Sequence, residues 1–142
     1  MWYSCGMLIG RICLSAIFIL SGLGKFVDYP TTAAYMASKG MTLIPVFLYG
    51  AGLIELIGGL SILLGFMARW GAALLMVYLI PVTFIFHSFW NVSVPAMATI
   101  EMIMFMKNLA IFGGLWFVIS CGAGGCSCDA CSCKKTAELK RP

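Results

Sequence analysis

Residues 51–65 read AGLIELIGGLSILLG, an apolar stretch interrupted by a single carboxylate, that of Glu55. The stretch belongs to one of four long apolar runs, at residues 7–27, 43–67, 70–90 and 97–120. A helix needs about 20 apolar residues to cross a bilayer, and each run is long enough. Because hydrocarbon offers the backbone no hydrogen-bond partners, and because the runs lack the alternation of barrel strands, we expect transmembrane helices.

The composition agrees with this interpretation, since 62% of the residues are hydrophobic and only 10% are charged. We therefore predict an all-α, four-transmembrane-helix bundle over residues 1–120, followed by a cysteine-rich, basic tail over residues 121–142. The first run is interpreted as a retained helix and not as a cleaved signal peptide. No basic residue precedes it, Arg11 lies inside it, and it has no obvious small-x-small cleavage site.

The distribution of basic residues predicts the orientation of the bundle. Four crossings place both termini on one side, together with the loop that contains Arg69. That side carries Arg11, Arg69, Lys134, Lys135, Lys140 and Arg141, whereas the other side carries Lys25 and Lys39. We expect both termini in the cytoplasm and the protein in the bacterial plasma membrane. Its net charge of +4 is explained by this bias and by anionic headgroups, without a nucleic-acid partner.

Two further features concern the connections and the third helix. Residues 31–40 read TTAAYMASKG and fit either a short amphipathic helix at the outer interface or an ordered loop. Pro81 lies inside the third run, where we expect a kink.

Two opposite charges lie deep in the predicted bundle. At the helical rise, Glu55 lies roughly 18 Å beyond Leu43, and Lys107 lies roughly 15 Å beyond Met97. A lone ion at such a depth costs roughly 3 kcal/mol or more. We therefore predict that Glu55 pairs with Lys107, with Arg11, nearer the surface, as the competing partner.

A second polar group is expected toward the outer face. Lys25 and Asp28 end the first helix, and His87 lies late in the third. Glu101 lies early in the fourth helix and shares a face with Asn108. Because histidine titrates near neutral pH, a His–Glu–Lys group there suits a quinone headgroup or a proton relay.

Structural explanations exist for the same residues. Lys25 and Arg11 lie close enough to helix ends to extend their charges to the headgroups. His87 lies near Trp90 and is also compatible with the aromatic belt at the interface. Glu55 would then form a purely structural ion pair, although acids at this depth are more often functional.

Several short motifs follow one another along the chain: GR at 10–11, SGLGKF at 21–26, IELIGG at 54–59, Arg69, FHSFW at 86–90, KNL at 107–109 and GGL at 113–115. In this order and spacing they resemble the DoxX family of small four-helix bacterial membrane proteins. The resemblance implies a plasma-membrane protein. Some members of the family are linked to sulfur or quinone redox chemistry, including subunits of thiosulfate:quinone oxidoreductase. The cysteine-rich tail is not part of the family pattern.

The tail concentrates five of the seven cysteines in the sequence CGAGGCSCDACSC. The candidate metal ligands are Cys126, Cys128, Cys131 and Cys133. Such dense spacing suits a thiophilic ion, Cu(I) or Zn(II), and Lys134 and Lys135 favour thiolates. The alternatives are S-acylation of the cysteines or, if the orientation is reversed, disulfides.

Three classes of function remain open at this stage. The first is the membrane subunit of an oxidoreductase system, which binds a quinone or relays protons and works with a soluble redox partner protein. The second is a small transporter or metal-handling protein, which would need a homo-oligomer because four helices leave little room for a pore. The third is a scaffold or assembly factor without catalysis.

Overall fold

The computed structural model describes residues 2–131, with side chains from residue 5 onward. Its elements are α1 (Trp2–Val27), α2 (Tyr29–Ser38), α3 (Ile44–Leu64), α4 (Ala68–Phe86), the 3₁₀ helix η1 (Phe89–Asn91) and α5 (Pro95–Cys121). Four of these segments are long and apolar enough to cross a membrane, which confirms the predicted transmembrane helices. The segment expected as a helix or a loop forms α2, and Pro81 lies inside α4.

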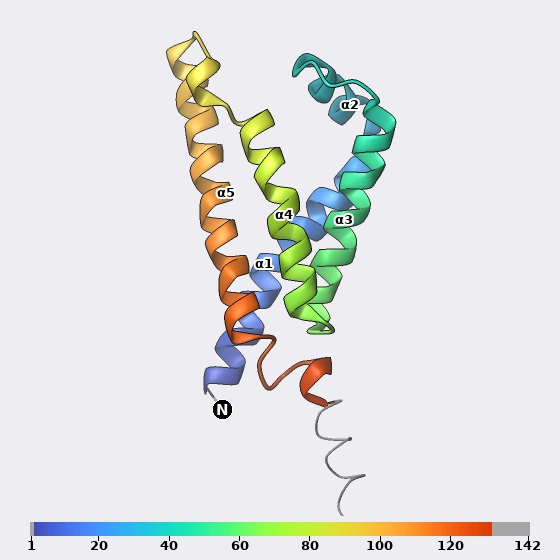
Figure 1. Ribbon diagram of the computed structural model, residues 1–142, viewed down its shortest axis with the longest axis vertical. Coiled ribbons are helices and arrows are strands. Elements are labelled where there is room, and N and C mark those ends of the chain that lie inside the picture. Colours follow the sequence, from blue (N-terminus) through green and yellow to red (C-terminus); the bar gives the residue numbers. More distant parts are fainter. Residues whose placement is uncertain (1, 132–142) are drawn as a thin grey trace, which may run out of the picture.

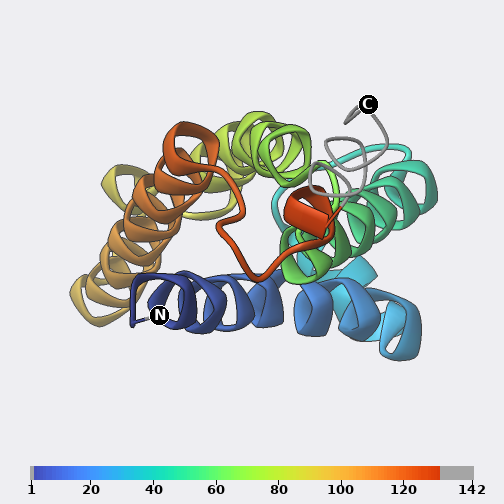
Figure 2. The same ribbon diagram turned by 90° about the horizontal axis from the view of Figure 1, so that it is seen from below.

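The helices α3, α4 and α5 converge toward the end where α5 finishes, α1 runs obliquely behind them, and α2 lies at the other end of α3 (Figure 1). Viewed along the bundle, α3, α4 and α5 follow one another in an arc and α1 closes the open side (Figure 2). The helix α3 packs against α1 and α4, whereas α5 packs mainly against α4. We call the end where α1 begins and α5 ends the terminal end. Its location in the cytoplasm stays a prediction from charge.

Small residues bring α3 close to both of its neighbours. A Cβ atom added to Gly22 of α1 would lie 3.0 Å from the carbonyl oxygen of Gly52 in α3. A Cβ atom added to Gly58 of α3 would lie 2.5 Å from Leu75 of α4. Transmembrane helices gain contact area by such close approach, because lipid tails are as apolar as the side chains. This packing makes α3 the central helix of the bundle.

Arg11 fastens the terminal end of the bundle. Its side chain is only 3% exposed and donates hydrogen bonds to the carbonyl oxygens of Ile62 (2.8 Å) and Leu63 (2.6 Å), in the last turn of α3. It also donates to the carbonyl oxygens of Ala123 (2.6 Å) and Cys126 (2.9 Å). The last carbonyls of a helix have no partner within it and favour a cation. Arg11 therefore neither extends to the headgroups nor competes for Glu55.

The first part of the tail packs against the terminal end of the bundle. The carboxylate of Asp129 accepts hydrogen bonds from the backbone N–H groups of Met67 (3.0 Å) and Ala68 (3.4 Å), where α4 begins. The backbone N–H of Asp129 donates to the carbonyl oxygen of Gly65. Gly65 has a φ of 66°, and a Cβ atom there would lie 2.5 Å from Ser127. Residues 122–131 thus cover the turn between α3 and α4.

Replacing Arg11 with methionine tests the role of this side chain. Hydrogen bonds from a charged group contribute about 1.5–3 kcal/mol each, and the variant removes four such bonds to backbone carbonyl groups. We expect Arg11→Met to lower the free energy of unfolding in detergent by at least about 3 kcal/mol, as measured by circular dichroism during denaturation. Arg69, an exposed arginine of α4, provides the control, and Arg69→Met should change stability by less than about 0.5 kcal/mol. Equal effects of the two variants would contradict the assignment.

Candidate functional site

A buried cluster of polar side chains, here called the deeper cluster, joins three helices near the middle of the bundle. The Lys25 ammonium of α1 lies 2.6 Å from Oε2 of Glu55 in α3, and Glu55 is only 5% exposed. The other carboxylate oxygen, Oε1, accepts hydrogen bonds from the hydroxyl of Tyr78 in α4 (2.9 Å) and from Ser21 of α1 (3.2 Å). Lys25 also donates to the Ser21 hydroxyl (2.9 Å). The carboxylate is therefore both neutralised and hydrogen-bonded on both of its oxygens.

The predicted pair of Glu55 with Lys107 is wrong. Lys107 is exposed, and its nearest polar contact among the described residues is the sulfur of Met104, at 4.0 Å. Both charges lie at similar depths, but α5 packs mainly against α4 and not against α3, and Lys107 lies on an outward face. Depth along a helix does not determine the direction in which a side chain points.

Lys25 lies deeper than its position near the end of α1 suggests. The ring of Phe26 stacks on that of Tyr49, one full turn inside α3, with centroids 5.8 Å apart. The end of α1 is therefore level with the interior of α3 and not with its first residue. The α1 helix thus ends beside α3, where Lys25 contacts Glu55, and α2 continues across the end of α3 (Figure 1).

A second polar cluster lies where α2, α4 and α5 meet. His87 Nδ1 lies 2.8 Å from Oε2 of Glu101, and the Lys39 ammonium lies 3.1 Å from Oε1 of the same carboxylate. Lys39 also donates to the carbonyl oxygen of Phe86 (2.9 Å) and lies 5.5 Å from the centre of the Tyr35 ring. Burial raises the pKa of the Tyr35 hydroxyl above its usual value, so this group stays protonated at neutral pH. The expected His–Glu–Lys group is formed with Lys39, since Lys25 belongs to the deeper cluster.

Asn108 connects α5 to α4 between these two clusters. Its side-chain amide donates to the hydroxyl of Thr83 (3.0 Å), which in turn donates to the carbonyl oxygen of Leu79 (2.7 Å). The amide of Asn108 thereby has a partner within the bundle, and its position is fixed.

A cavity of about 620 Å³ extends along both clusters. Its polar lining includes Lys25, Glu55 and Tyr78 from the deeper cluster, and His87 from the cluster around Glu101. Asn108 also lines it. The rest of its wall is mainly apolar and comes from all five α-helices, with side chains such as Phe18, Met36, Val46, Val82 and Ile111. Its size lies within the range of small-molecule sites, about 300–1,000 Å³, and such sites combine apolar walls with a few fixed polar groups.

The sequence model of the DoxX family matches residues 6–88, more than half of the chain. The chain belongs to the DoxX family. The expected similarity to this family is thereby confirmed, and the matched region contains both partners of the Lys25–Glu55 ion pair, together with Tyr78 and His87.

Individual relatives support the same assignment. The inner membrane protein YqjF of Escherichia coli is 35% identical over 92% of this chain and 94% of its own length. The inner membrane protein YphA of the same organism is 32% identical over 87% of each chain. No solved structure matches the chain. This DoxX protein is thus a multi-pass protein of the bacterial inner membrane, as the sequence predicted.

The structure leaves the metal prediction for the tail of this DoxX protein as a prediction. Cys126, Cys128 and Cys131 are exposed free thiols, and Cys133 lies outside the described residues. Among the residues that the structure describes, no group of three or more histidine, cysteine or acidic side chains is placed to hold a metal ion.

Sequence reasoning missed the roles of four polar residues around the cavity, Ser21, Lys39, Tyr78 and Thr83. Tyr78 offered the clearest signal, since it is the one tyrosine in the run 70–90 and a buried hydroxyl needs a hydrogen-bond partner. Ser21 lies one helical turn before Lys25, a spacing that places both on one face. Lys39 carried no such signal, because it lies beyond the end of α2, and the direction of a residue in a connection cannot be read from periodicity.

Lysine variants distinguish the observed ion pair from the one predicted by depth. Lys25→Met leaves the Glu55 carboxylate without its counter-charge, and breaking a buried pair in this way costs about 3 kcal/mol or more. We expect this loss in the unfolding free energy of the purified protein in detergent, and Glu55→Gln should restore most of it in the double variant. Lys107→Met should leave the stability of the isolated protein unchanged within about 0.5 kcal/mol. A larger effect from Lys107→Met than from Lys25→Met would overturn the assignment of the pair.

Proposed function

We propose that this DoxX protein is the membrane subunit of an oxidoreductase system and that its cavity binds a quinone headgroup. The observation that carries the proposal is the cavity itself, which presents polar groups from two clusters inside an otherwise apolar wall. A quinone is a flat ring with two carbonyl acceptors and an apolar tail, so it needs donors at separate positions and an apolar surround. Membrane quinones reach such a cavity from within the bilayer.

The residues of the cavity fit this ligand. The Lys25 ammonium has three N–H donors and gives two of them to Glu55 and Ser21, and the Asn108 amide has two and gives one to Thr83. Each therefore keeps one donor for a ligand carbonyl, and His87 is a further polar group on the wall. A buried donor that meets a ligand carbonyl gives selectivity, because a ligand without the carbonyl leaves the donor unpaired. A quinone supplies exchange of two electrons and two protons when bound, and the protein supplies the binding groups.

His87 and Glu101 are the groups that this proposal assigns to proton handling. Glu101 engages Nδ1 of His87, and this contact leaves Nε2 as the ring nitrogen for a ligand or a proton acceptor. Lys39 holds the other carboxylate oxygen and fixes the orientation of Glu101. An imidazole oriented in this way can bind and release one proton at the cavity wall. The electron donor is assigned to a redox partner protein.

Binding of decylubiquinone by the purified protein tests the proposal, with decylbenzene as a ligand that has the same tail and no carbonyl groups. A ligand that binds the folded state at one hundred times its Kd adds about 2.7 kcal/mol to stability. We expect decylubiquinone to raise the unfolding midpoint and decylbenzene to have little effect. His87→Ala removes a polar group of the cavity wall, and Tyr78→Phe removes the hydroxyl that orients Glu55 beside Lys25. Each variant should weaken the quinone Kd about tenfold.

Tyr49→Phe is the matched control, since Tyr49 is an exposed tyrosine outside the cavity lining, and its Kd should equal that of the unmodified chain. If decylbenzene raised the unfolding midpoint as much as decylubiquinone, the stabilisation would come from the apolar tail alone and would contradict recognition of the quinone ring. Unchanged affinity in both Tyr78→Phe and His87→Ala would place any bound quinone elsewhere on the protein.

A further inference from the structure

Lys107 is an exposed cation in the middle of a membrane-spanning helix. At a rise of about 1.5 Å per residue, it lies roughly 18 Å from the start of α5 and roughly 21 Å from its end. The hydrocarbon core is about 30 Å thick, so the ammonium is too far from either headgroup layer for its stem to reach water. Within the described chain it has no carboxylate within ion-pair distance. Exposure of this charge to lipid is energetically unfavourable.

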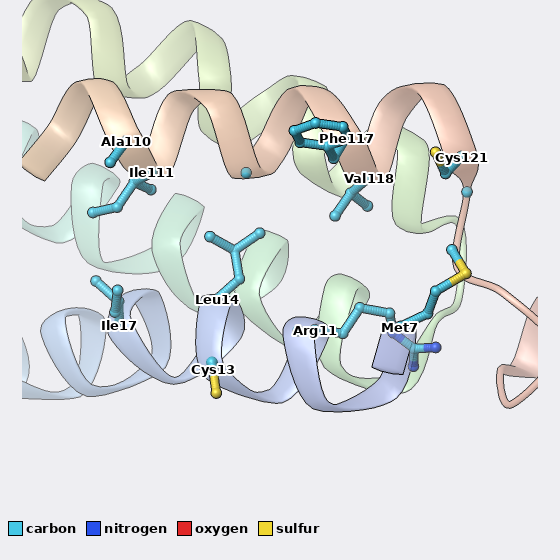
Figure 3. Close-up of a pocket in the computed structure, with 13 residues that line it drawn as sticks. Met7, Arg11, Cys13, Leu14, Ile17, Ala110, Ile111, Phe117, Val118 and Cys121 are labelled. Carbon is cyan, nitrogen blue, oxygen red and sulfur yellow. The ribbon is translucent and has the colours of Figure 1, made fainter. Parts of the chain in front are cut away.

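The charge lies at the end of an apolar groove between α1 and α5. The groove has a volume of about 590 Å³, and Leu14 and Ile17 of α1 face Ile111 and Val118 of α5 across it (Figure 3). Along α5 its lining includes Ala110, Ile111, Gly114, Phe117 and Val118. Lys107 precedes Ala110 by three residues, Ile111 by four and Gly114 by seven, a spacing that places it on the same face of the helix. The lysine and the groove therefore form one continuous surface, here called the Lys107 face.

We propose that the Lys107 face binds a transmembrane helix of a different protein, and that this helix carries an aspartate or glutamate level with Lys107. The groove gives room for side chains of the partner helix, and the small residues Gly10, Ala110 and Gly114 allow its backbone to approach. The carboxylate supplies the counter-charge that Lys107 lacks. A polar pair of this kind fixes both the register and the identity of the partner.

Charge complementarity excludes the other sources of a counter-charge at this depth. Phospholipid phosphates lie in the headgroup layers and not at mid-depth. A second copy of the chain offers two acids within its described membrane-spanning helices, Glu55 and Glu101, and both are already ion-paired. Asp28 follows the end of α1, and Asp129 caps α4 at the terminal end. The occupant is therefore a heterologous helix. The inference does not depend on quinone binding, since Lys107 does not line the quinone cavity.

Site-specific photocrosslinking of the full chain in membranes of its native host tests this surface. The aromatic crosslinker p-benzoylphenylalanine replaces Phe117, which lines the groove, or Trp116, an exposed neighbour that does not. We expect a crosslinked product from position 117 and none from position 116. Its yield should fall about tenfold or more in Lys107→Met and be retained in Lys107→Arg, because loss of one partner of a desolvated charge pair costs at least about 1.4 kcal/mol.

Mass spectrometry of the product then identifies the partner. A transmembrane segment with an aspartate or glutamate near its middle supports the proposal, and exchange of the two charges should restore the product that Lys107→Glu alone abolishes. A product that contains only copies of this 15.4 kDa chain would overturn the heterologous partner in favour of self-association. No product, or a product whose yield is independent of Lys107, would overturn the docking surface altogether.

Discussion

The ion pair between Lys25 and Glu55 determines how the rest of the bundle is arranged. A carboxylate this deep is tolerated because one cation and two hydroxyl groups surround it, and these come from both helices that pack on α3. To supply them, α1 must end level with the interior of α3, and α4 must present Tyr78 to the same point. The glycines at 22, 52 and 58 allow this approach, since side chains there would hold the helices apart. Close packing of α1, α3 and α4 is therefore what brings the polar partners of Glu55 together.

The same ion pair divides the bundle into two regions with different tasks. Toward the terminal end, Arg11 donates its hydrogen bonds to backbone carbonyl groups. Asp129, in the segment after α5, accepts a hydrogen bond from the turn between α3 and α4. That region is held by hydrogen bonds between these two side chains and backbone groups. Toward α2, polar groups line a cavity and have capacity for a ligand, as His87 does at Nε2. Rigid anchoring at one end and a lined cavity at the other is the arrangement expected of a binding site on a fixed scaffold.

Hydropathy is sufficient to predict the helices. Only helices and closed barrels span a bilayer, and each apolar run has the length that a helix needs to cross it. Hydropathy is also sufficient to single out Glu55, Lys25, His87 and Glu101, since charges in apolar runs are costly wherever they point. Hydropathy does not predict which charges form ion pairs. Depth alone pairs Lys107 with Glu55, but the partner of a charged side chain depends on which helices touch and on where each helix ends. Lys39 shows the same limit, because its contact with Glu101 is created by the path of α2 and not by any local pattern.

The wrong pairing also indicates where this protein is incomplete as a single chain. Glu55 of α3, Glu101 of α5 and His87 at the end of α4 all find partners within the bundle. The α5 helix carries two charged side chains, Glu101 and Lys107, and Lys107 is the one that is exposed. It lies near the middle of the hydrocarbon core, where a charge is most costly. A helix whose polar residues all served the fold would turn this one inward beside Asn108, which contacts α4. The outward lysine therefore belongs to a surface, and the apolar groove beside it gives that surface the shape of a helix-binding site.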